Sequence, residues 1–130
     1  MNKEEYSKQG KANKRKGREF ERQVAKDIQR YFPHCKAMAS PRSGGYGLDF
    51  PGDLVIKNNN LLAEFFWECK KTKRFEIDKW MKECDERVQP GWSPAIVMSH
   101  PGTTDKLVTM KFLDWLKYMF ELDGYRNEDI

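Results

Sequence analysis

Cysteine is scarce in this sequence, and long apolar runs are missing from it. The 130 residues include three cysteines, widely spaced at positions 35, 69 and 84, and none of them stands in the CxxC spacing of a structural zinc site. Such an odd set is typical of a reduced cytoplasmic protein rather than of a disulfide scaffold. No stretch approaches the ~20 apolar residues of a membrane span, and the first residues contain no apolar segment of a signal peptide. We therefore expect a cytoplasmic protein.

The excess of basic residues lies near the N-terminus, and the net charge of the whole chain is only +4. Residues 1–30 contain ten Lys or Arg against five Asp or Glu, and the stretch from Lys8 to Arg18 contains six cations and no acid. A basic arm that enters a helix is typical of nucleic-acid-binding proteins, and a frayed, solubilising terminus is the alternative. We expect a flexible basic arm over residues 1–12, one folded domain over residues 13–122 and a short acidic tail over residues 123–130.

Apolar periodicity predicts helices and strands in alternation. Val24, Ile28 and Phe32 recur every four residues and predict a helix that begins near Asn13, its N-cap, and ends before Pro33. The remaining pattern predicts strands over residues 35–39, 54–56, 61–70, 95–99 and 107–110, and helices over residues 77–88 and 112–120. This order indicates a single α/β domain with a mixed central β-sheet flanked by helices. The apolar helix over residues 112–120 is core or interface, and we favour core.

Glu21 is an acid on the inward face of the predicted first helix. It lies three and four residues before Val24 and Ala25, whereas Glu19 falls on the polar side with Arg15. A carboxylate that faces a core needs a partner, because burying an unpaired charge is costly. A salt bridge is the ordinary partner, and a metal ion is the alternative.

Residues 51–70 combine a predicted turn with three charged residues. Asp53 precedes the apolar run over residues 54–56, the three asparagines at 58–60 are typical of a turn, and Glu68 and Lys70 close the next strand. An antiparallel hairpin that turns at 58–60 would bring Asp53 and Glu68 to the same end. Glu68 and Lys70 share one face of the strand because side chains alternate between faces, so Cys69 is expected to point into the apolar layer.

This combination of residue types suits phosphodiester hydrolysis. Mg²⁺ prefers oxygen ligands and is typically held by one or two carboxylates, which Asp53 and Glu68 would supply beside the backbone carbonyl of Cys69. Glu21 would be an outer-shell ligand or a ligand of a second metal. Lys70 would orient the attacking water and stabilise charge that develops on the phosphate. The alternative is an ordinary charged hairpin in which these residues are incidental.

Glycine-rich and basic segments flank the predicted site. The loop over residues 40–50 contains glycines that allow close backbone approach to a phosphate, although such loops are more often connectors. A second basic cluster follows Lys70 directly. The residues predicted to contact DNA are Lys14, Arg15, Lys16, Arg18, Arg42, Ser43, Gly44, Lys71, Lys73 and Arg74.

The motifs resemble those of the PD-(D/E)XK nuclease superfamily, and most closely those of Holliday junction resolvases of the archaeal and phage type. The superfamily signature corresponds to Pro51-Gly52-Asp53 followed by Glu68-Cys69-Lys70. The resolvase resemblance covers residues 14–74 in order. Its parts are a basic segment with glycine and Glu-Arg (residues 16–22), an Arg-Ser-Gly loop (42–44), Asp-Leu-Val (53–55) and Glu-Cys-Lys with a Lys/Thr-rich continuation (68–73).

The resemblance implies a restriction-endonuclease-like core and, by motif position, catalytic roles for Glu21, Asp53, Glu68 and Lys70. It also implies dependence on Mg²⁺ with Mn²⁺ as a substitute, a homodimer, and structure-selective cutting of four-way or branched DNA in recombination and repair. The compartment would be the cytoplasm of a bacterial, archaeal or phage-infected host cell. The long glycine-rich loop and the Trp-rich second half depart from the resolvase pattern. A general, restriction-type or recombination nuclease, or a member that binds DNA without cutting it, therefore stays open.

Overall fold

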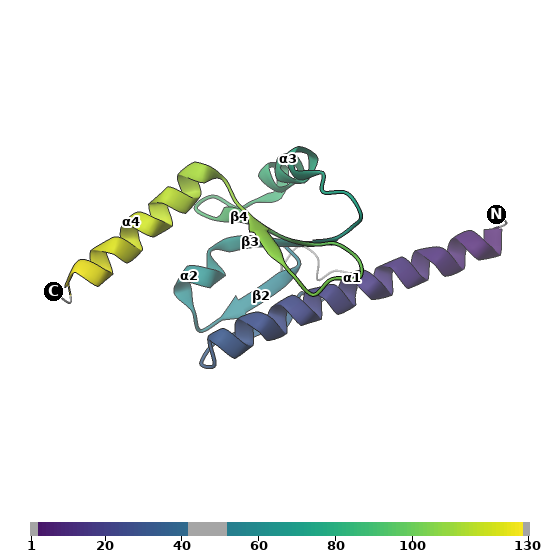
Figure 1. The fold of residues 1–130 in the computed structure, drawn as a ribbon, viewed down its shortest axis with the longest axis horizontal. Coiled ribbons are helices and arrows are strands. Elements are labelled where there is room, and N and C mark those ends of the chain that lie inside the picture. The colour runs from purple at the N-terminus through teal and green to yellow at the C-terminus, as the bar shows by residue number, and fades with distance from the viewer. Residues whose placement is uncertain (1–2, 42–51, 129–130) are drawn as a thin grey trace.

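The computed structural model describes residues 3–41 and 52–128, which form helices and strands in alternation (Figure 1). The helices are α1 (Lys3–Tyr31), α2 (Asn60–Ala63), α3 (Ile77–Arg87) and α4 (Phe112–Glu128). The strands are β1 (Lys36–Ala39), β2 (Leu54–Lys57), β3 (Phe65–Lys71), β4 (Ser93–Ser99) and β5 (Leu107–Thr109). Across the described ranges, no helix has the length and apolarity needed to cross a bilayer.

The strands form two small sheets. In one sheet β1 and β2 pair antiparallel, and in the other β4 lies between β3, its parallel partner, and β5, its antiparallel partner. All seven residues of β4 are buried, as expected for a central strand covered on both faces. The predicted α/β class with a mixed sheet flanked by helices is confirmed, although β1 and β2 form a sheet of their own instead of joining one central sheet.

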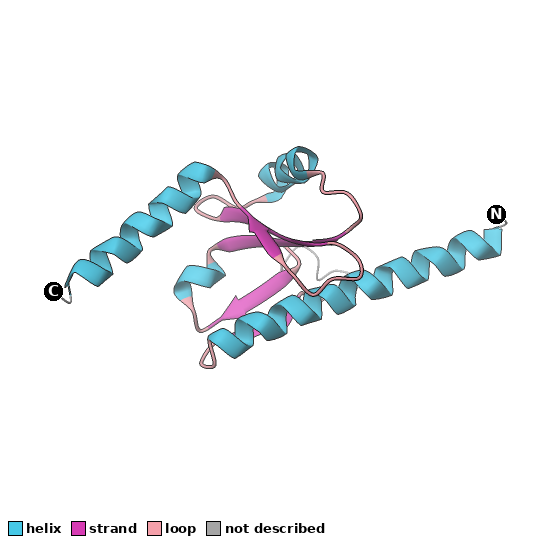
Figure 2. Cartoon of the chain, viewed as in Figure 1, coloured by secondary structure: helices cyan, strands magenta, loops and turns pink. Residues whose placement is uncertain are grey.

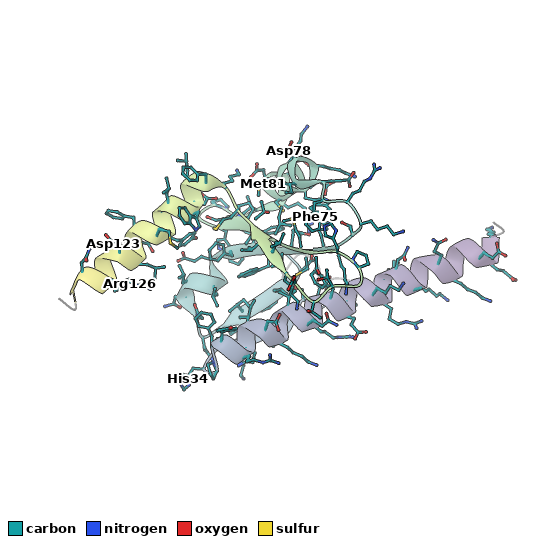
Figure 3. The ribbon with its side chains drawn as sticks, in the orientation of Figure 1. His34, Phe75, Asp78, Met81, Asp123 and Arg126 are labelled. Carbon is teal, nitrogen blue, oxygen red and sulfur yellow. The ribbon has the colours of Figure 1, made fainter. Side chains whose placement is uncertain are left out.

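Helices α1 and α3 cover opposite faces of β3 and β4 (Figure 2). Alternate residues of β3 point to opposite sides, so Trp67 packs with Phe20 and Val24 of α1, whereas Phe66 packs with Trp80 of α3. On the α3 side, Phe75 and Met81 add partly buried apolar surface (Figure 3). Cys69 packs against the α1-side cluster as a partly buried thiol, which confirms its predicted orientation into the apolar layer.

The hairpin predicted to turn at residues 58–60 was wrong. Asn58 adopts a left-handed conformation at φ 62°, but the side chain of Asn59 then accepts a hydrogen bond from the backbone N–H of Leu62 and caps α2. β3 pairs with β4 in parallel, which requires the crossover through α3, and β2 pairs with β1 instead. The start of β2 still meets β3, because the backbone N–H of Asp53 donates to the carbonyl of Trp67 at 2.6 Å.

Helix α1 begins at Lys3, so the predicted start at Asn13 was wrong. Residues 3–12 lack the apolar period on which the prediction depended. Helix propagation from a packed segment needs no apolar face, and Glu4 and Glu5 in the first turn interact favourably with the helix dipole. The N-terminal half of α1 extends beyond the sheets as a straight continuation (Figure 1). The division into arm, domain and tail stays a prediction.

Helix α4 begins where predicted, but its expected role as core was wrong. It extends away from the sheets (Figure 1), and it carries exposed apolar side chains on several sides. Tyr118 is buried, and its ring lies 4.7 Å from that of Phe65. The exposed apolar residues are Phe112, Leu113, Trp115, Leu116, Met119, Phe120, Leu122 and Tyr125. An apolar helix of this kind normally lies against a second surface.

Candidate active site

A cleft of about 540 Å³ collects the residues predicted to carry the chemistry. It lies where α1, the start of β2, the middle of β3 and the end of α3 meet. Its lining residues are Asn13, Lys14, Gly17, Glu21, Ser40, Pro41, Gly52, Asp53, Glu68, Cys69, Lys70 and Arg87. The structure thus brings Glu21, Asp53, Glu68 and Lys70 together although they come from three separate elements.

Asp53 is held by backbone contacts on both sides. Its N–H donates to the carbonyl of Trp67 at 2.6 Å, and its carbonyl accepts from the N–H of Ser40 at 2.9 Å. Its Oδ2 atom accepts a hydrogen bond from the N–H of Cys69 at 2.8 Å. The preceding Gly52 has φ +78°, and a Cβ atom there would lie 2.7 Å from the carbonyl oxygen of Trp67. Glycine therefore permits the close approach that aims the Asp53 carboxylate at β3.

Glu68 lies opposite Asp53 and is nearly buried, with its side chain 8% exposed. Burial, followed by the nearby Asp53 carboxylate, raises the pKa of Glu68 from its ordinary value of 4.5 to about 7. Arg87 and Lys70 act in the opposite direction and keep the pKa lower than these two causes alone would. Two carboxylates that face each other in a buried position indicate a site that favours a cation.

Glu21 and Lys70 approach the two carboxylates from different layers. Glu21 is 3% exposed on the inward face of α1, as its helical spacing predicted. Glu19, in contrast, is exposed. Lys70 lies on β3, two residues from Glu68, and its Nζ is 5.8 Å from the centre of the Trp80 ring. This contact directs the ammonium group along an apolar wall toward the cleft.

The donor set fits a hard divalent cation held mainly by Asp53 and Glu68. Within residues 3–41 and 52–128, no group of three or more His, Cys, Asp or Glu side chains has the geometry of a metal site. Mg²⁺ requires no such group, because one or two carboxylates completed by water and substrate phosphate are its usual protein ligands. Burial and then repulsion by Asp53 raise the pKa of Glu68, and a divalent cation between the two carboxylates would relieve that repulsion. A ligand role for the Cys69 carbonyl stays a prediction.

Sequence reasoning missed Arg87 and Ser40, and it placed Gly52 in the signature without its structural role. Arg87 forms an ion pair with Glu68. Ser40 belongs to none of the motifs, yet its Oγ donates a hydrogen bond to the carbonyl of Gly52 at 2.9 Å. Gly52 permits the close approach to the backbone of Trp67. Helical spacing could have found Arg87, because it follows Trp80 and Cys84 at intervals of seven and three. No local signal indicated Ser40, whose contacts depend on how β1 meets β2.

The predicted DNA contacts fall into separate groups. Lys14 lines the cleft, and Lys16 and Lys71 line an adjacent groove of about 500 Å³ on the other side of Gly17. Arg18 instead donates from Nη1 to the carbonyl of Ser40 at 3.2 Å, so it holds the segment that precedes the site. Arg15, Lys73 and Arg74 are exposed. Arg42, Ser43 and Gly44 lie outside the described residues.

Comparison with known proteins gave one family. The family model described as "Phage putative PDDEXK endonuclease" matches residues 12–120, which include every residue of the cleft. Comparison with curated proteins and with solved structures gave no match.

Proposed function

Because this chain belongs to the phage PDDEXK endonuclease family, we propose that it is a metal-dependent DNA endonuclease that selects four-way or branched junctions. Membership confirms the resemblance to the PD-(D/E)XK superfamily. The narrower resemblance to Holliday junction resolvases supports the proposed choice of substrate. A family of phage proteins also fits activity in the cytoplasm of an infected cell.

The observation that carries this proposal is the convergence of Glu21, Asp53, Glu68 and Lys70 on one open cleft. The three acids and the lysine reach it from α1, the start of β2 and β3. Asp53 and Glu68 face each other closely enough for the charge of one to raise the pKa of the other. An incidental pair of charged strand ends would have no reason to bury both carboxylates against each other.

Six residues of the cleft have a role that their environment supports. Asp53 and Glu68 would hold Mg²⁺ or Mn²⁺ together with the Cys69 carbonyl, and Glu21 would be an outer-shell ligand or a ligand of a second ion. Such a cation, when bound, polarises the scissile phosphate and lowers the pKa of a bound water. Lys70 would orient that water and stabilise negative charge on the phosphate oxygens in the transition state. Lys14 would bind a neighbouring phosphate from the α1 side.

We expect Mg²⁺-dependent cleavage of a synthetic four-way junction to exceed cleavage of linear duplex, single-stranded and flap DNA of the same sequence by at least about tenfold. The reason is that substrate choice within a shared site depends on the surfaces around it. The measurement is a time course of end-labelled strands on denaturing gels, with EDTA as the metal-free control. Equal cleavage of the linear duplex would leave a general or restriction-type nuclease, and DNA binding without any cleavage would leave a non-cleaving member.

We also propose that the protein is a homodimer and that α4 forms its interface. Phe112, Phe120 and Tyr125 are each about seven-tenths exposed or more, so these three rings leave roughly 300–500 Å² of apolar surface uncovered. Five further apolar residues of α4 bring the exposed area toward the ~800 Å² per partner of a stable interface. Leu107 and Val108 of the neighbouring β5 are also exposed and extend this surface.

Leu113→Glu combined with Phe120→Glu is expected to convert the dimer to a folded monomer. Both side chains are more than three-quarters exposed within one chain, so two charges there would disrupt a second copy without disturbing the core. The measurement is molar mass by light scattering across a concentration series, with circular dichroism to show that the fold persists. Tyr31→Glu is the matched control, because Tyr31 is an equally exposed aromatic outside α4. A wild-type protein that is monomeric at high concentration would contradict the proposal.

A further inference from the structure

Arg87 forms an ion pair with Glu68, one of the acids of the cleft. Its Nη1 atom lies 3.1 Å from Oε1 of Glu68 and donates a hydrogen bond to it. Arg87 belongs to the last turn of α3, and it also lines the cleft. Neither the superfamily signature nor the motif order of the chain includes this arginine.

The guanidinium of Arg87 packs on an aromatic ring on one side and lines the cleft on the other. Its Cζ atom lies 5.3 Å from the centre of the Phe66 ring, which is almost completely buried. The arginine side chain is nevertheless 60% exposed, whereas its partner Glu68 is 8% exposed. A planar cation that rests on an aromatic face keeps its orientation while its outer N–H groups face water. Arg87 is therefore already directed toward whatever enters the cleft.

The hydrogen bond from Arg87 to Glu68 competes with coordination of a divalent cation by the same carboxylate. The oxygen that accepts from Arg87 belongs to the carboxylate that would hold the cation with Asp53. A dication at that carboxylate would also repel the guanidinium charge a few ångströms away. The displaced arginine would need a new acceptor, and the two non-bridging oxygens of a phosphodiester are an anionic pair that the parallel N–H donors of a planar guanidinium fit well.

We propose that Arg87 is an exchange residue: it pairs with Glu68 in the metal-free protein, and it transfers to a DNA phosphate when a divalent cation occupies Asp53 and Glu68. This inference depends on the proposed function, and it adds a third phosphate-binding cation to Lys14 and Lys70 on the cleft wall. In the metal-free state Arg87 is a positioning residue for Glu68. In the metal-bound state it contacts the substrate. The exchange couples metal binding to DNA binding.

The first test measures binding of Mg²⁺ alone, by calorimetry at pH 8.5 without DNA. Arg87→Gln removes a competitor for Glu68 and a nearby positive charge, so we expect it to bind Mg²⁺ at least about fivefold more tightly than wild type. Arg87→Lys keeps the charge and should stay close to wild type. Lys82→Gln is the matched control, because Lys82 is an exposed cation of α3 that does not line the cleft. A purely structural arginine predicts the opposite sign, so weaker or unchanged Mg²⁺ binding by Arg87→Gln would overturn the exchange.

The second test measures DNA affinity against salt, by fluorescence anisotropy of a labelled four-way junction. With Ca²⁺ in place of Mg²⁺ to slow cleavage, Arg87→Gln should lower the slope of log K against log[salt] by about 0.9, the value of one lost phosphate contact. In EDTA the slopes of Arg87→Gln and wild type should agree, because Arg87 is then held by Glu68. Equal slopes in Ca²⁺ would overturn the exchange. Absence of DNA binding by the wild type would instead contradict the proposed function, and the Mg²⁺ measurement would still decide the pairing of Arg87.

Discussion

Asp53→Asn is expected to lower the rate of DNA cleavage on the order of 10³-fold or more while leaving DNA binding intact or tighter. The substitution removes a charged oxygen ligand from the pair that faces the cleft, and it also removes negative charge from the path of the phosphates. Glu68→Gln should behave in the same way. The measurements are single-turnover cleavage and anisotropy on the same junction. Glu64→Gln is the matched control, because Glu64 is an exposed acid outside the cleft and should keep the wild-type rate.

Asp53→Asn should also stabilise the folded, metal-free protein at alkaline pH. Burial and then the Asp53 carboxylate raise the pKa of Glu68 from 4.5 to about 7, so the folded state holds this proton to higher pH than the unfolded chain does. The stability linked to Glu68 is therefore complete below about pH 4.5 and is lost as the pH rises through about 7, a change of roughly 3 kcal/mol for a shift of this size.

Asp53→Asn removes the second of these causes and should lower the pKa of Glu68. We therefore expect the variant to melt at a higher temperature than wild type at pH 8 in EDTA, and the difference to shrink or reverse at pH 4.5. Carboxyl carbon shifts in NMR titrations would report the pKa of Glu68 directly. A variant that loses both cleavage and stability at pH 8 would assign Asp53 a structural role instead.

Gly52→Ala is expected to have the largest effect of any substitution outside the charged residues. Gly52 has φ +78°, where an L side chain is strained, and the added Cβ would lie 2.7 Å from the carbonyl oxygen and 3.1 Å from the nitrogen of Trp67. Backbone atoms of a paired strand cannot yield as a flexible side chain can. We expect a loss of about 2–4 kcal/mol of stability, by denaturant unfolding, together with a cleavage rate at least about 100-fold lower.

The loss of cleavage would follow from displacement of the next residue. The carbonyl that the new Cβ would meet is the one that accepts the hydrogen bond from the N–H of Asp53. Gly91→Ala is the control that tests backbone strain without a steric clash. Gly91 has φ +84°, and an added Cβ would meet nothing within 4 Å. We expect that control to lose about 1 kcal/mol and to keep the wild-type cleavage rate. Equal effects of the two substitutions would show that the close approach of Gly52 to β3 has no part in aiming Asp53.

The sequence predicted which residues meet in the cleft better than it predicted the strand pairing that brings them together. Helical spacing predicted that Glu21 lies on the inward face of the first helix, and the structure places it in the cleft because Val24 and Ala25 face the core. Asp53 and Glu68 were expected to meet through a hairpin that does not form. They meet because Asp53 bonds to Trp67 and Cys69 across the gap between the two sheets. The local pattern predicts strands over residues 54–57 and 65–71. It does not indicate whether these strands pair with each other or with β1 and β4.

The errors fall where local patterns carry no information about the partner surface. Residues 3–12 lack an apolar face, so the sequence pattern did not predict that they are helical. In the structure they continue the packed part of α1. The apolar residues of α4 were read as core, since apolar periodicity indicates burial without naming the surface that covers it. Tyr118 contacts the chain's own core through Phe65, whereas Phe112 and Phe120 remain exposed within one copy.

The sequence by itself determined the α/β class, the inward position of Glu21 on α1 and the face of β3 on which Glu68 and Lys70 lie. These follow from periodicities of 3.6 and two residues, which act over a single element. Only the tertiary structure decided that β3 pairs with β4 rather than β2, that Gly52 closes on Trp67, and that Arg87 reaches Glu68 from the end of α3. Those features depend on contacts between elements distant in sequence, where the free energy of packing chooses among pairings that are locally equivalent.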